Sequence, residues 1–360
     1  MYSILNNLSN QTKNIVYTFL LILLVFVFWK YRQSVGIETN RSKTTDKVTI
    51  YGETMGTTYS IISFGSEKVS LQFSIDSLLE TFNKSLNTYL VDSEISTFNR
   101  DTSFTFISPY FYPVLEKSRE VYTWTEGRFD PTVMPLVNAW GFGPENIKLP
   151  DSLTVKEILQ TVGFSKIDFN AKEVWKLDTK TTLDFSAIAK GYGVDVVSGF
   201  LSAKGFGNHF VEIGGEVRCE GINLDTGKAW KVGITDPSSS LGETKLYAAI
   251  TLQDAAIATS GNYYNFREIE GVKYAHTIDP VTGYPVQHEM LSASVIARDC
   301  MTADALATAF MVAGIKKSIE LIEKIPETEA VFIYLNASGE VEYYMTENIK
   351  KAVQLTPKQE

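Results

Sequence analysis

An apolar run near the N-terminus places the strongest constraint on how this chain folds. Residues 15–29 contain no charged side chain, so a helix formed from them has no polar face and is not a surface helix. The run is shorter than the roughly 20 residues of a straight membrane span, but Trp29, Tyr31 and a Lys30 side chain that reaches the interface can extend it. A signal-peptide core has a similar length, yet no small-x-small cleavage site follows. We expect an uncleaved signal anchor, one transmembrane helix, over residues 15–32; a buried core helix is the alternative.

The regions around this anchor follow from polarity and charge. Residues 1–14 form a short tail, residues 33–46 a polar linker, residues 47–350 the folded body and residues 351–360 a C-terminal tail. The basic residues directly after the apolar run favour a body on the cytoplasmic side, by the positive-inside rule.

The composition is that of an ordinary folded protein. The chain has 360 residues, 44% hydrophobic and 21% charged, which is not the balance of a disordered chain. One large domain and two coupled domains both suit this length. The formal charge of −9 leaves no basic patch for a phosphate backbone and excludes nucleic-acid binding. Two cysteines exclude a disulfide scaffold and a four-cysteine zinc site, and three histidines exclude a histidine-rich metal site.

Periodic patterns in the body predict helices mixed with short strands. Apolar residues at helical spacing predict helices over residues 75–86 and 301–314, and Thr154 to Glu157 form a capping-box pattern before another helix. The remaining segments are expected as a helix over residues 113–127 and strands over residues 48–51, 57–64, 174–177, 209–213, 216–219, 230–234, 246–252, 292–296, 331–335 and 341–344. The irregular order of these elements favours an α+β fold with mixed sheets and flanking helices over a βαβ series.

Residues 183–193 combine the features of an anion-binding site. We expect a strand to end at Asp184 and a helix to begin near Ala187, so that the helix N-terminus and Lys190 face the same region. Glycines at 191 and 193 allow a ligand or another backbone to approach closely. This combination suits a phosphate-bearing ligand. An ordinary capped helix with Lys190 in solvent is the alternative.

A second cluster suits a divalent cation. Asp304 and Thr308 are one turn apart on a predicted helix, so a carboxylate and a hydroxyl point the same way. Mg²⁺ takes such hard oxygen ligands and completes its shell with water and phosphate oxygens. The alternative is that Asp304 only offsets the dipole of its own helix.

A third cluster places a histidine before a tight turn. His276 ends a predicted strand, and the Asp-Pro-x-x-Gly sequence that begins at Asp279 is typical of a turn. An imidazole that titrates near neutral pH suits a general base, and a structural histidine is the alternative. We expect His209 and His288 to be structural.

In their order along the chain, these clusters resemble the ApbE family of FAD:protein FMN transferases. The resemblance covers about residues 48–314, and its strength lies in the series, because each motif alone is weak. The matching stretches are residues 55–57, Tyr89, residues 92–96, 98–99, 129–132, 135–137, 140–143, 184–191, 212–215, 276–283 and 304–308.

The resemblance implies a single ApbE-type α+β body that binds FAD in a cleft. With Mg²⁺, such a body transfers the FMN part of FAD to a Ser or Thr hydroxyl of a target flavoprotein and releases AMP. Carried over by position, the Mg²⁺ ligands are the backbone carbonyl of Ala187 and the side chains of Asp304 and Thr308. The FAD contacts implied in the same way are Met55, Tyr89, Arg128, Phe129, Asp130, Asp184, Lys190 and Ile278.

The resemblance also bears on the proton acceptor, the partners and the location. His276 is expected to take the proton of the acceptor hydroxyl. The expected acceptors are flavoprotein subunits of membrane redox complexes, with the body on the periplasmic, extracytoplasmic side of the inner membrane, against the local charge bias. Two alternatives stay open: a Mg²⁺-dependent FAD pyrophosphatase, and a membrane-tethered flavin-binding protein without turnover.

Overall fold

A computed structural model of the chain describes residues 46–65, 71–142, 149–237, 245–261, 266–269, 272–275 and 277–355, with residues 23, 25–27 and 30. The chain divides into two compact units, residues 1–46 and residues 47–360, and the fold below is that of the second.

The predicted anchor lies mostly outside the described residues. Residues 23, 25–27 and 30 are helical, and the rest of residues 15–32 is not described. Within the described part of the chain, no helix combines the length and the apolar character that a membrane span needs. The anchor and the linker over residues 33–46 therefore stay predictions.

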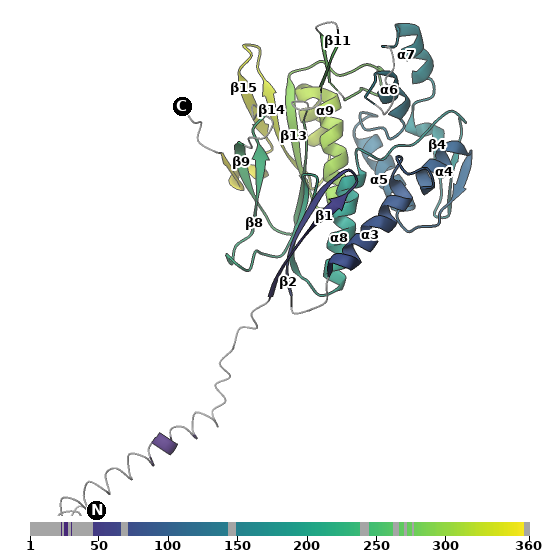
Figure 1. Cartoon of the computed structure of the whole chain (residues 1–360). Helices are drawn as coiled ribbons and strands as arrows, with labels where there is room; N and C mark the ends of the chain where they lie inside the picture. Colours follow the sequence, from purple (N-terminus) through teal and green to yellow (C-terminus); the bar gives the residue numbers. More distant parts are fainter. Residues whose placement is uncertain are drawn as a thin grey trace, which may run out of the picture. The chain divides into compact units, whose positions relative to one another are not determined.

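An eight-stranded sheet forms the centre of the body (Figure 1). Its strand order is β1-β2-β6-β7-β10-β13-β14-β15, and the pairings described from β2 to β15 are antiparallel. The strands are β1 (Asp46–Thr54), β2 (Thr57–Gly65), β6 (Asn208–Ile213), β7 (Glu216–Glu220), β10 (Ala255–Gly261), β13 (Met290–Ala297), β14 (Glu329–Leu335) and β15 (Val341–Met345). Burial alternates along β6, as expected for a strand with one face on the core, whereas β13 is buried along nearly its whole length.

Helices cover one face of this sheet (Figure 1). The helix α9 (Cys300–Ile322) contacts β10 and β13, while α8 (Ala189–Ala203) contacts β6 and β7, and the two helices contact each other. Gly314 interrupts α9 with a φ of 71°, which matches the predicted end of that helix. The other helices are α3 (Leu71–Leu86), α4 (Glu94–Arg100), α5 (Phe111–Trp124), α6 (Met134–Ala139), α7 (Ser152–Leu159) and the short 3₁₀ helices η1 (Phe164–Lys166) and η2 (Asn348–Lys351).

A three-stranded sheet, β16-β9-β8, packs against the other face. It consists of β8 (Trp230–Thr235), β9 (Leu246–Leu252) and β16 (Val353–Leu355). Trp230 and Cys219 belong to the buried cluster between the two sheets. The smaller sheets are β3 (Ser103–Thr105) with β5 (Glu173–Lys176) and β4 (Ile167–Phe169), and β11 (Phe266–Ile269) with β12 (Val272–Ala275).

Two boundaries in particular differ from the sequence prediction. The C-terminal tail was expected to begin at residue 351, but residues 353–355 pair with β9 and therefore belong to the folded body. The helix expected after Thr154 is capped three residues earlier, where the side chain of Asp151 accepts a hydrogen bond from the Thr154 amide at 2.8 Å. An acidic N-cap outside the capping box therefore sets this helix start.

The strand expected to end at Asp184 does not form. Residues 181–185 have no regular secondary structure, and α8 begins at Ala189. The side-chain amide of Asn99 takes the place of a neighbouring strand. It donates to the carbonyl of Leu183 and accepts from the Leu183 amide, both at 2.7 Å.

Candidate active site

A cavity of about 860 Å³ lies beside the first turns of α8 and α9. Its wall is built from loops that follow α3 and α5, the turn before α8, the end of β10 and the loop before β13. The predicted site residues in this wall are Tyr89, Arg128, Phe129, Asp130, Asp184, Ala187, Lys190, Ile278, Asp304 and Thr308. The fold thus gathers positions as far apart in the sequence as Tyr89 and Thr308 around one cavity.

The turn before α8 is fixed by hydrogen bonds of Asp184. Its amide donates to the carbonyl of Pro131 at 2.7 Å, and its Oδ1 accepts from the amide of Ser186 at 2.7 Å and the Ser186 hydroxyl at 2.5 Å. Burial raises the pKa of the Asp184 carboxyl, and the bonds from Ser186 oppose that shift. This turn holds Ala187 at the cavity wall.

Lys190 lies between two buried carboxylates. Its Nζ is 2.5 Å from Oε1 of Glu216 and 4.0 Å from Oδ1 of Asp304. Burial by itself lowers the pKa of Lys190, but the charges of Asp304 and Glu216 outweigh it and raise the pKa. Burial and the charge of Asp304 raise the pKa of Glu216, while its ion pair with Lys190 opposes the shift. The wall therefore offers one ammonium group that a phosphate can share.

The predicted metal ligands lie on the same wall. Asp304 is buried, its Oδ2 accepts from the Gly191 amide at 2.9 Å, and Thr308 Oγ1 is 3.2 Å from Ser260 Oγ. Among the described residues, no group of three or more His, Cys, Asp or Glu forms a metal cluster. The donors fit a hard cation with few protein ligands, because a carboxylate, a hydroxyl and the Ala187 backbone line one cavity where Glu216 Oε2 is buried without a partner.

Arg128 and Asp130 contribute differently to the opposite part of the wall. Arg128 Nη1 is 3.2 Å from Asp279 Oδ2, across 151 positions of sequence, so it ties the wall to the turn that follows Ile278. The Asp130 carboxylate points into the body, where it accepts from Thr132 Oγ1 at 2.6 Å and the Phe164 amide at 3.0 Å. Burial raises the pKa of Asp130 and these bonds oppose the shift, so its side chain organises the wall.

Two predicted site residues do not appear in the described wall. His276 lies outside the described residues. Met55, in the left-handed region with a φ of 50°, packs against the cores around α3 and α8, and its Cε would lie 2.5 Å from a Cβ at Gly193.

Further residues line the cavity without having been predicted as site residues. Glu216 is the main one, and its signal in the sequence is the glycine pair directly before it, both with positive φ. Met311 and Val312 continue the α9 side of the wall one turn after Thr308. Their apolar side chains carry no signal that separates them from core residues of the same helix.

Comparison with known protein families identifies the group to which this chain belongs. The model of the ApbE family matches residues 55–332, most of the chain. The chain belongs to the ApbE family. A relative from Vibrio cholerae serotype O1, named FAD:protein FMN transferase, is 40% identical over 291 residues, which is 78% of this chain and 86% of that protein. A relative of the same name from Haemophilus influenzae is 39% identical over 298 residues, covering 78% of this chain and 85% of that protein.

Solved ApbE structures share the fold. The flavin transferase ApbE from Vibrio cholerae matches with a TM-score of 0.76 and 36% identity, over 85% of this chain and 99% of that one. The apo flavinyl transferase ApbE from Pseudomonas stutzeri matches with a TM-score of 0.76 and 29% identity, over 85% and 96% of the two chains. The expected ApbE-type α+β body is thus confirmed, and the family is one of transferases.

Proposed function

We propose that this chain is a Mg²⁺-dependent FAD:protein FMN transferase. It would move the FMN part of FAD to a Ser or Thr hydroxyl of a target flavoprotein and release AMP. The observation that carries the proposal is the wall where Lys190, Glu216, Asp304 and Thr308 meet at a cavity large enough for a dinucleotide. Relatives at 40% and 39% identity carry the name of this activity.

The cavity divides into a phosphate side and a ring side. On the phosphate side, Lys190 pairs with the pyrophosphate, and Asp184 holds the turn that brings Ala187 to it. On the other side Tyr89, which is 71% exposed, offers aromatic surface to a planar ring, whereas Phe129, a further FAD contact in the proposal, lines the wall with its ring buried in the core. The remaining FAD contacts in the proposal are Met55, Arg128, Asp130 and Ile278.

The backbone carbonyl of Ala187 and the side chains of Asp304 and Thr308 would hold Mg²⁺. When bound, the ion supplies charge neutralisation at the phosphate oxygens. Lys190 adds a second positive charge from the protein, and the Gly191 amide keeps Asp304 turned toward the cavity through its bond to Oδ2. Phosphoryl transfer depends mostly on such positioning and charge.

The reaction makes one phosphorus–oxygen bond and breaks another. The acceptor hydroxyl oxygen bonds to the FMN phosphorus, the bond from that phosphorus to the bridging oxygen breaks, and AMP leaves with that oxygen. The hydroxyl proton goes to a base, and we assign that role to His276, which precedes the turn at Asp279 and Pro280.

Membrane attachment belongs to the same proposal. A signal anchor over residues 15–32 would hold the body at the inner membrane, on its periplasmic side, near flavoprotein subunits of redox complexes. Confinement to one surface raises the effective concentration of enzyme and acceptor.

The decisive experiment follows AMP release and covalent flavin mass on a Thr-containing acceptor domain, with FAD and Mg²⁺. A transferase should give both products. Both should be lost on metal chelation, in Asp304→Ala, and in a His276→Ala variant that still binds FAD normally. AMP with free FMN across several acceptors would show a pyrophosphatase instead. Tight FAD binding with neither product would show a flavin-binding protein.

A further inference from the structure

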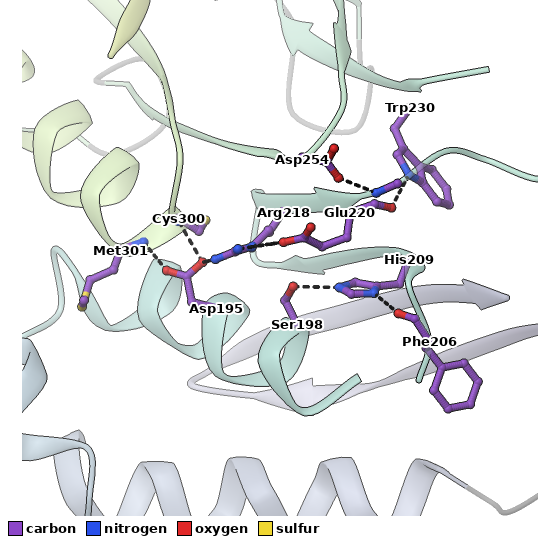
Figure 2. Close-up of polar contacts among 11 residues, drawn as sticks. Asp195, Ser198, Phe206, His209, Arg218, Glu220, Trp230, Asp254, Cys300 and Met301 are labelled. Atoms are coloured by element: carbon purple, nitrogen blue, oxygen red, sulfur yellow. Dashed lines mark hydrogen bonds and ion pairs between the residues drawn. The ribbon is translucent and has the colours of Figure 1, made fainter. Parts of the chain in front are cut away.

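Asp195 of α8 and Asp304 of α9 each accept hydrogen bonds from backbone amides in the first turn of the other helix. Figure 2 shows those that Asp195 accepts. Asp195 of α8 accepts from the backbone amides of Cys300 at 2.9 Å and Met301 at 2.8 Å, the first two residues of α9. In the opposite direction, Asp304 of α9 accepts from the Gly191 amide in the first turn of α8. Amides at these positions have no partner within their own helix, so each helix completes the hydrogen bonding of the other.

Arg218 holds Asp195 in this arrangement. Its Nη1 donates to Asp195 Oδ1 at 2.8 Å, and its Nη2 donates to Glu220 at 2.7 Å. The Asp195 side chain is only 12% exposed. Arg218 lies on β7, two residues after Glu216 and therefore on the same face of the strand. The Arg218–Asp195 ion pair thus joins β7 to α8, and Asp195 continues the link to α9 through the amides of Cys300 and Met301.

The helices α8 and α9 approach so closely at Gly191 that a side chain does not fit between them. A Cβ atom at Gly191 would lie 2.3 Å from the backbone oxygen of Cys300 and 2.7 Å from Cβ of Asp304. The Cys300 carbonyl is therefore packed against α8 while its amide is bound to Asp195. A displacement of α9 at this point would carry Asp304 with it.

We propose that Asp195 is a positioning residue for the metal-binding helix, since its bonds to the first turn of α9 fix where Asp304 and Thr308 present their oxygens to the cavity. This inference rests on the proposed function. Asp195 is not part of the cavity wall, so it acts through α9 and not on the substrate. Outer-shell groups that orient metal ligands typically change metal affinity by about 10- to 100-fold.

The test is Asp195→Asn in the whole chain, which keeps the size of the side chain and removes its charge. We expect the Mg²⁺ concentration for half-maximal AMP release to rise by about 10- to 100-fold. The same shift is expected in a readout without turnover, the Mg²⁺ titration of flavin fluorescence with bound FAD. FAD affinity in EDTA should change less than about twofold, because the variant leaves Lys190 and the cavity wall in place.

The matched control is Asp254→Asn. Asp254 also accepts a backbone hydrogen bond, from Gly221 at 2.7 Å in the turn after β7 (Figure 2), and its variant should keep the Mg²⁺ dependence of the wild type. Arg218→Lys provides a second variant should Asp195→Asn not fold, with a smaller shift in the same direction. A folded Asp195→Asn or Arg218→Lys with wild-type Mg²⁺ titrations would overturn the inference alone. A wild-type chain that does not respond to Mg²⁺ would overturn both this inference and the proposed metal dependence.

Discussion

At the scale of single residues, Lys190 supplies the positive charge that lies beside the buried carboxylates of the candidate active site. Its ammonium group is the cation beside Glu216, whose side chain is 5% exposed, and it also lies 4.0 Å from the buried Asp304. Removing one partner of a buried ion pair leaves the other without compensation and is far costlier than removing both. In the proposed function the same ammonium group also pairs with the pyrophosphate of FAD, so both stability and FAD binding should depend on this one side chain.

Replacing Lys190 with Met should separate these two contributions. We expect Lys190→Met to lower the free energy of unfolding by about 3 kcal/mol, because Glu216 stays buried without its cation. Adding Glu216→Gln should restore stability to within about 1 kcal/mol of the wild type, whereas FAD affinity should stay at least about tenfold lower in both variants. Urea denaturation and flavin fluorescence measure the two effects. A double variant no more stable than the single one would contradict this account.

At the scale of elements, the candidate active site depends on how closely α8 and α9 approach each other. Gly191 is the point of contact, and a side chain there would meet backbone, which cannot move aside. Gly199 lies on the same helix with no atom within 4 Å of an added Cβ. The two glycines therefore give one helix both a test position and a matched control.

Gly191→Ala should lower the free energy of unfolding by about 1–3 kcal/mol, as expected for overpacking at a tight contact. Gly199→Ala should leave stability unchanged or raise it by up to about 1 kcal/mol, because alanine is the better helix former. Denaturant titrations of both variants measure the difference. Equal stabilities would mean that α9 can withdraw from α8 without cost.

Elements with a local cause were predictable from the sequence. Alternating burial in β6 and the buried face of α3, with Ile75, Leu79 and Phe82, follow directly from sequence periodicity. Elements with a distant cause were not. The segment before Asp184 is held by the side chain of Asn99, 84 positions earlier in the chain, a contact that no local pattern contains.

The active site follows the same division. Its residues were predicted by resemblance to a family, and the structure places most of them around one cavity. Glu216 was not predicted as a site residue, because its role depends on contact with Lys190, which is 26 positions earlier on a different element. The glycine pair at positions 214 and 215 marks a turn before Glu216, but no pattern in the sequence shows that β7 packs beside α8 and brings Glu216 to Lys190.

The whole molecule divides at the boundary between its two compact units. All residues that line the cavity belong to the unit of residues 47–360. The first strand, β1, begins at Asp46, so a chain cut just before it keeps the complete sheet.

A chain of residues 45–360 should therefore bind FAD with the affinity of the full chain, within about twofold. If the anchor prediction is correct, the full chain should sediment with membranes and need detergent for extraction, whereas the shortened chain should stay in the supernatant. Cell fractionation and flavin fluorescence measure these outcomes. A full chain found in the supernatant would show the anchor prediction to be wrong.

The burial of both cysteine thiols determines how the folded body responds to oxidants. Cys219 on β7 and Cys300 at the start of α9 are both free and buried, and burial raises the pKa of both thiols. Oxidation and disulfide exchange require an accessible thiolate. Once folded, the body exposes neither thiol to oxidants, so its cysteines do not restrict the native state to a reducing or to an oxidising compartment.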